Sequence, residues 1–111
     1  MNWFLDLLSV VFGFSLVKRV TFTNDGRSGQ IVYTDIRGAI EFYFEFGGGN
    51  CLAIVTVPDY EEWSAQTGRN ALERASILNF VGSEIVRQQA PGGKYVITDE
   101  AIEVYSSRGP S

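Results

Sequence analysis

The chain has 111 residues, the length of one domain rather than two. Its formal charge is −4, with nine Lys and Arg residues scattered along it, no histidine and one cysteine. These counts exclude histidine-based catalytic sites, zinc–thiolate sites and an intrachain disulfide. The scattered positive charge argues against a nucleic-acid partner, because phosphate binding needs a concentrated basic patch. We therefore expect a cytoplasmic protein that needs no metal or organic cofactor.

Residues 1–17 are strongly apolar. They lack the basic start and the small-residue cleavage site of a standard signal peptide. As a helix, their apolar part would span about 22 Å, less than the hydrocarbon core of about 30 Å. We interpret the segment as a helix with one polar stripe, formed by Asn2, Asp6 and Ser9.

Such a helix would leave an apolar patch that soluble monomers rarely expose. We predict that a symmetric homodimer buries this patch between its subunits. The predicted contacts between subunits are Trp3, Phe4, Leu7, Leu8 and Val11. Packing on the same chain, on a different partner or on a membrane are the alternatives. Asp6 on the polar stripe disfavours the membrane, because interfacial helices usually carry Lys or Arg there.

Four strand-like segments follow, at residues 20–23, 30–34, 39–46 and 51–57. The third alternates strictly, which predicts one buried and one solvated face. Its predicted core side chains are Ile40, Phe42, Phe44 and Phe46, and its predicted solvated ones are Glu41, Tyr43 and Glu45. The fourth is almost entirely apolar, which predicts a central strand covered on both faces and ended by Pro58.

Helix signals come next. Asp59 can cap a short helix that reaches Trp63, and Asn70 with Glu73 resembles a capping box that starts the main helix. The main helix ends at residues 90–93, and its predicted buried face is Ala71, Ala75, Leu78, Val81, Gly82 and Ile85.

The chain closes with short strands at residues 94–98 and 101–105 and a polar tail, 106–111, that we expect to fray. Because strands and helices are grouped along the chain, the pattern predicts a single α+β domain. We expect a mainly antiparallel sheet of about six strands, with the N-terminal helix and one main helix packed on one face.

Paired carboxylates are the remaining catalytic option. Glu41 and Glu45 would lie about 13 Å apart along one strand, too far for a glycosidase pair, which needs about 5 to 9.5 Å. Glu103, on another strand, could approach either one. A solvated sheet face is the simpler interpretation of these acids.

Aromatic residues among acidic ones suggest where a basic partner could bind. The candidate partner-binding residues are Tyr60, Glu61, Glu62, Trp63, Phe80 and Glu84. The alternatives are that Trp63 plugs the end of the core and that another element, such as the N-terminal helix, covers Phe80.

The pairs Glu62-Trp63, Thr67-Gly68 and Glu73-Arg74, followed by the runs at 77–80 and 95–102, have a layout that resembles small acidic α+β immunity proteins of bacterial polymorphic-toxin systems. The resemblance covers less than half of the chain and implies an inhibitor that binds a cognate toxin or enzyme. The negative charge, the lack of a catalytic constellation and the surplus of aromatic residues make a non-catalytic binding protein the leading hypothesis. The alternatives are an oligomeric structural or scaffold subunit that uses the apolar N-terminal helix, and a small carboxylate-dependent enzyme.

Overall fold

The structure is a computed structural model that describes residues 18–109. The predicted N-terminal helix, with the predicted subunit contacts Trp3, Phe4, Leu7, Leu8 and Val11, lies outside the described residues. The elements are β1 (Arg19–Asn24), β2 (Ser28–Asp35), β3 (Gly38–Phe46), β4 (Cys51–Thr56), α2 (Tyr60–Thr67), the 3-10 helix η2 (Ala71–Glu73), α3 (Arg74–Gln89), β5 (Lys94–Ile97) and β6 (Ala101–Tyr105).

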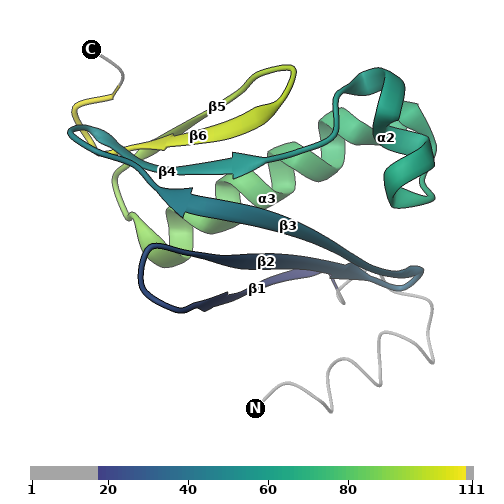
Figure 1. The fold of residues 1–111 in the computed structure, drawn as a ribbon, viewed down its shortest axis with the longest axis horizontal. Coiled ribbons are helices and arrows are strands. Elements are labelled where there is room, and N and C mark those ends of the chain that lie inside the picture. Colours follow the sequence, from purple (N-terminus) through teal and green to yellow (C-terminus); the bar gives the residue numbers. More distant parts are fainter. Residues whose placement is uncertain (1–17, 110–111) are drawn as a thin grey trace.

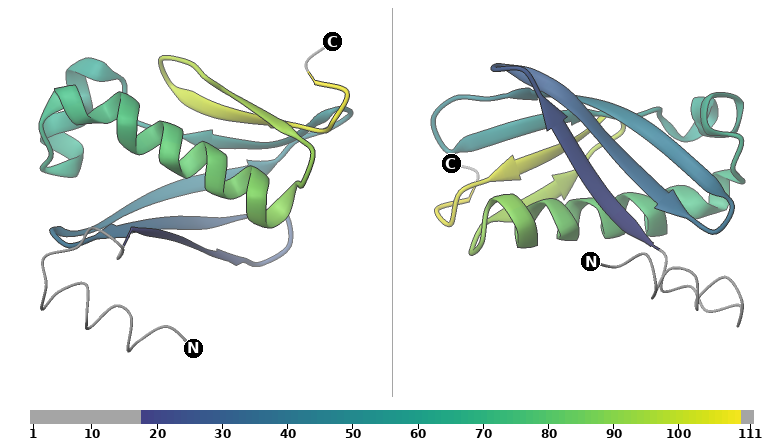
Figure 2. Two further views of the ribbon diagram at one scale, coloured as in Figure 1. Left: turned by 180° about the vertical axis from the view of Figure 1, so that it is seen from behind. Right: turned by 90° about the horizontal axis from the view of Figure 1, so that it is seen from below.

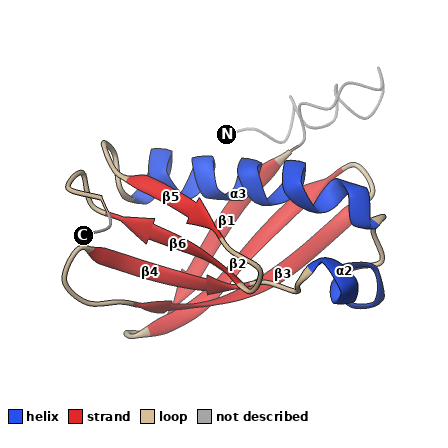
Figure 3. Cartoon of the chain, turned by 90° about the horizontal axis from the view of Figure 1, so that it is seen from above, coloured by secondary structure: helices blue, strands red, loops and turns tan. Residues whose placement is uncertain are grey.

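The six strands form one sheet in the order β1-β2-β3-β4-β6-β5, and every neighbouring pair is antiparallel (Figure 1). Helix α3 runs across one face of the sheet, and α2 lies at one end of it (Figures 2 and 3). The predicted α+β class, antiparallel sheet and main helix are thus confirmed. No helix within residues 18–109 is long and apolar enough to cross a membrane.

The core lies between the sheet and α3. The helix contributes Ile77, Leu78, Val81, Gly82 and Ile85, and the sheet contributes alternate residues of its strands. Gly82 allows close packing, because a Cβ atom there would lie 2.5 Å from the ring of Tyr95 in β5. Ala75, predicted to be buried, is exposed. The buried stripe instead includes Ile77.

Local capping signals in the sequence are confirmed. The Asp59 side chain accepts a hydrogen bond from the Glu62 amide at the start of α2, which continues past Trp63 to Thr67. Asn70 and Glu73 form a capping box, with the Asn70 side chain accepting from the Leu72 amide and Glu73 accepting from the Asn70 amide. The box opens with one 3-10 turn before α3 begins.

Two burial predictions are wrong because no helix within residues 18–109 covers the side chains concerned. Phe46 was expected in the core but is 51% exposed, because it lies at the end of β3 where the helical layer ends. The fourth strand was expected to be covered on both faces, yet Leu52 and Ile54 are 39% and 41% exposed. Only one face of the sheet carries a helix among the described residues, so alternate side chains of β4 face outward (Figure 3).

The start of the predicted frayed tail is ordered. The Ser106 amide donates to the Asn50 carbonyl, and the Gly109 amide donates to the Ser106 carbonyl. These bonds form a closing turn on β6, which includes the buried Gly109.

Candidate interaction surface

The face of the sheet opposite α3 carries an unusual mixture of apolar, tyrosine and acidic side chains. Cross-strand register places Glu45 opposite Ile54, Ile54 opposite Glu103, and Glu103 opposite Val96. Residues directly opposite each other in an antiparallel pair project from the same face. The row therefore presents acid, isoleucine, acid and valine across β3, β4, β6 and β5. We call this surface, with its neighbours Tyr43, Leu52 and Tyr105, the open face.

The open face is available to solvent in its apolar as well as its polar parts. Tyr43 is 49% exposed and Val96 is 39% exposed, beside the exposed Ile54 and Leu52. Each tyrosine hydroxyl bonds to an acid two residues away on its own strand. Tyr105 donates to Glu103 at 2.8 Å, and Tyr43 donates to Glu45 at 3.4 Å. The result is an apolar centre between two Tyr–Glu pairs.

The register also places the carboxylates relative to one another. Glu45 and Glu103 stand on either side of Ile54, so their backbones are about 10 Å apart. The two acids flank an isoleucine rather than facing each other directly. This arrangement suits contact with a cationic surface better than an acid–base pair acting on one bond.

The predicted partner-binding residues do not form one patch. Tyr60, Glu61 and Glu62 are exposed on α2, while Phe80 and Glu84 belong to α3, on the helical side of the sheet. Glu84 pairs with Arg87 at 2.7 Å. Phe80 is partly buried and meets the ring of Tyr33 edge-on at 5.8 Å, with the Lys18 ammonium 5.9 Å from its centroid.

Trp63 is not a surface anchor. It is 0% exposed and stacks against Phe42, with ring centroids 6.4 Å apart. Helix α2 turns this side chain under the end of the sheet, so the alternative interpretation of a core plug is the correct one. The indole N–H finds no acceptor within residues 18–109.

The open-face residues Ile54, Val96, Glu103 and Tyr105 were missed as partner-binding candidates. Three of the four lie in short strands at the end of the chain, where the alternation is too brief to distinguish the faces. Only on β3 is the alternation long enough to indicate the exposed face, and there Glu41, Tyr43 and Glu45 are exposed as predicted.

A second polar cluster joins the β2–β3 turn to the segment between α2 and η2. Arg69 is 7% exposed and makes two parallel bonds to Asp35, Nη1–Oδ2 at 2.8 Å and Nη2–Oδ1 at 2.9 Å. It also donates to the Gly38 carbonyl at 3.2 Å. The Tyr33 hydroxyl and the Arg37 amide donate to the same carboxylate. This fully bonded cluster has the character of a structural clamp.

The clamp shifts the pKa values of its members. Burial acts to raise the pKa of Asp35, but hydrogen bonds from Arg69, the Arg37 amide and Tyr33 outweigh it and lower that pKa from 3.8 to about 2. Burial, followed by the hydrogen bond to Asp35, raises the pKa of Tyr33 to about 12.

These shifts predict how stability depends on pH. Because the folded pKa of Asp35 is depressed, its contribution is complete above about pH 4 and is lost as pH falls through about 2. Urea melts of the wild type and of Asp35→Asn should therefore differ by about 2 kcal/mol near pH 6 and converge in strong acid. A difference that stayed constant down to pH 2 would contradict the assignment.

Among residues 18–109, no three acidic, cysteine or histidine side chains gather to form a metal site. The only cysteine, Cys51, is partly buried, and its thiol lies 3.7 Å from the Ala53 carbonyl. Comparisons of the chain with protein-family models, with curated proteins and with solved structures find no match. The resemblance to immunity proteins therefore stays a prediction, and the function has to be argued from the described surfaces.

Proposed function

We propose that this chain is a non-catalytic binding protein whose open face docks a basic protein partner. The observation that supports this most directly is the row Glu45–Ile54–Glu103–Val96, where exposed apolar side chains alternate with carboxylates. Interfaces bury apolar and tyrosine side chains at their centre and place charged groups around them.

The charge of the chain agrees with this choice of partner. The net charge is −4, and the carboxylates of Glu41, Glu45 and Glu103 belong to the strands of this face. Lys94, at the corner of the face opposite Tyr105, is its basic neighbour on β5. Complementary charge would speed association and select against acidic partners. An immunity-type inhibitor that covers a basic toxin is the specific form of this proposal.

The test compares one substitution at two exposed apolar positions. Ile54→Lys puts a positive charge at the centre of the open face, and Leu72→Lys puts the same charge on η2, where Leu72 is 79% exposed. Both variants should fold, because each side chain replaced is exposed. When immobilised, the wild type and Leu72→Lys are expected to retain the same basic protein from a lysate of the organism that naturally makes this chain.

Ile54→Lys should bind that protein at least tenfold more weakly, because it removes a central contact and repels a basic surface. Affinities of the purified pair, measured at low and high salt, give the comparison. Equal affinity of Ile54→Lys and Leu72→Lys would contradict the open face as the binding site. Retention of no protein by the wild type would contradict the binding function.

A further inference from the structure

The sheet is not paired along its whole length, and it forks between β3 and β4. Strand β3 pairs with β2 from Gly38 to Glu45, but with β4 only from Tyr43 to Phe46. Beyond Thr56 the chain no longer pairs with β3, while the Val57 amide still donates to the Glu100 carbonyl on the opposite side of β4. The first half of β3 therefore has no strand opposite it on this side within residues 18–109.

The hydrogen bonds at the other end of β3 show which backbone groups face the fork. The Phe46 amide donates to Arg27, toward β2, and the Gly47 amide donates to Leu52, toward β4. Peptide groups alternate direction along a strand, so odd-numbered residues of β3 direct their N–H and C=O toward β4. Ala39 and Glu41, both exposed, thus present four backbone groups to the fork. This is an open sheet edge inside the molecule.

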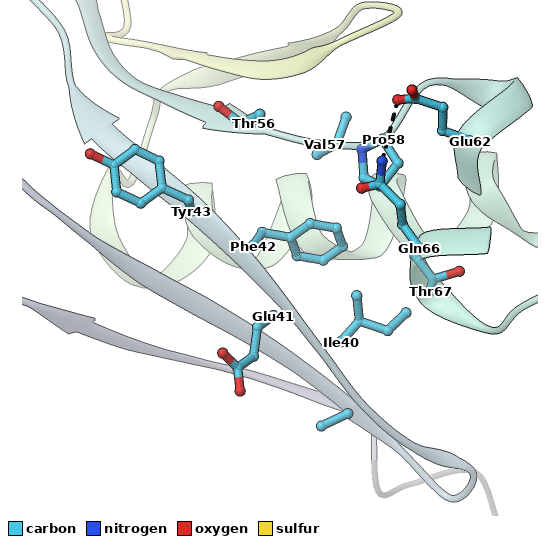
Figure 4. Close-up of a pocket in the computed structure, with 11 residues that line it drawn as sticks. Ile40, Glu41, Phe42, Tyr43, Thr56, Val57, Pro58, Glu62, Gln66 and Thr67 are labelled. Atoms are coloured by element: carbon cyan, nitrogen blue, oxygen red, sulfur yellow. Dashed lines mark hydrogen bonds between the residues drawn. The ribbon is translucent and has the colours of Figure 1, made fainter. Parts of the chain in front are cut away.

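A groove lies along this edge. It has a volume of about 450 Å³ and is bounded by β3, by Thr56–Pro58 and by α2. Ile40 and Phe42 project toward Pro58 and Gln66 and form its apolar side (Figure 4). The Phe42 ring is held in place by stacking on the buried Trp63. The groove is therefore preformed and does not require the core to open.

The charge of the groove indicates what it would accept. Its two charged lining residues, Glu41 and Glu62, are both acidic and exposed. The outer edges of the sheet differ, because β1 begins at Arg19, directly after Lys18, and β5 begins at Lys94. Lysine and arginine on an edge discourage strand addition by another basic chain. A basic strand is therefore expected to pair with β3 at the fork rather than with either outer edge of the sheet.

We propose that the fork binds an extended segment of a partner protein, which adds to β3 as a short strand opposite Ala39 and Glu41. Backbone bonds supply the attachment, as in other cases of strand addition. Alternate side chains of the segment would be small and apolar toward Ile40 and Phe42. The others would be Lys or Arg beside Glu41 and Glu62. The inference rests on the proposed function, since it names the part of a basic partner that the protein holds.

The experiment uses a capped synthetic peptide in which valine and lysine alternate over seven residues. It is titrated into the full chain, and the backbone amides are followed by NMR and by hydrogen exchange. We expect the amides of Ala39 and Glu41 to shift and to exchange at least tenfold more slowly with the peptide bound. The amides of β5 should not change.

Four controls test the charge, the backbone pairing and the location of the bound peptide. A valine–glutamate peptide should not bind, and a valine–lysine peptide with N-methyl groups on alternate residues should lose the protection of Ala39 and Glu41. The double variant Glu41→Gln/Glu62→Gln, at two exposed positions, should bind the valine–lysine peptide about tenfold more weakly. Ile54→Lys should leave the protection of Ala39 and Glu41 by the peptide intact, which keeps the fork distinct from the open face.

Unchanged exchange at Ala39 and Glu41 with millimolar peptide would overturn the inference. So would shifts confined to Ile54 and Val96, which would place the peptide on the open face and leave the proposed function standing. Protection that appears with rising protein concentration alone would make a second copy of the chain the occupant, and would also overturn it.

Discussion

Replacing Arg69 by alanine is expected to destabilise the protein by about 3 to 5 kcal/mol. The guanidinium group is nearly inaccessible and satisfies both oxygens of Asp35 and the carbonyl of Gly38. Its removal leaves a carboxylate that is 12% exposed without its counter-charge. Breaking one side of a buried pair costs far more than the pair contributes net, because the remaining charge is desolvated and uncompensated.

Arg37→Ala is the matched control. Arg37 is a neighbouring arginine that pairs with Glu73, but its side chain is 55% exposed, so its loss should cost less than about 1 kcal/mol. Urea denaturation near neutral pH measures both variants. The double variant Asp35→Ala/Arg69→Ala should be less destabilised than the sum of the two single changes. Equal destabilisation by Arg69→Ala and Arg37→Ala would show that the clamp is not a buried pair.

The clamp also bears on binding. Asp35 and Gly38 flank the turn that starts β3, and Arg69 follows the last turn of α2. One side chain therefore links two walls of the groove, the start of β3 and the end of α2. A ligand groove between a strand and a helix keeps its shape only if both are anchored, so the Asp35–Arg69 pair is part of what makes the groove preformed.

Local signals in the sequence predicted the elements well. Asp59, Asn70 and Glu73 lie within three residues of the amides they cap, so their roles can be read from spacing alone. Six strands and a main helix follow from periodicity and turn residues in the same way. The strand boundaries differ by a residue or two, as expected where pairing partners decide where a strand ends, whereas α2 continues to Thr67, beyond the predicted Trp63.

The surfaces could not be predicted in this way, because they depend on residues far apart in the chain. Asp35 and Arg69 are 34 residues apart, and the sequence singles out neither one. Ile54 reads as core because it stands in an apolar run. Its exposure depends on there being no helix over that face of the described sheet. The fork likewise depends on where β4 departs from β3, which no local pattern specifies.

Because a local pattern does not show which residues of a strand the helix covers, two phenylalanines on β3 give a sharp prediction. Phe44 and Phe46 are the same residue type, two positions apart on one strand, and alternation assigns both to the core. Phe44 is 5% exposed and Phe46 is 51% exposed. Phe44→Ala should therefore destabilise the protein by about 3 to 5 kcal/mol, through lost burial and the cavity left beneath α3.

Phe46→Ala should cost about 1 kcal/mol or less, even though its ring meets that of Phe44 edge-on at 5.4 Å. Glu45→Ala, on the open face between them, should cost as little and serves as the baseline for a change on this strand. Urea melts of the three variants give the comparison. Equal losses for Phe44→Ala and Phe46→Ala would mean that the helical layer reaches the end of β3, and that Phe46 belongs to the core as alternation predicts.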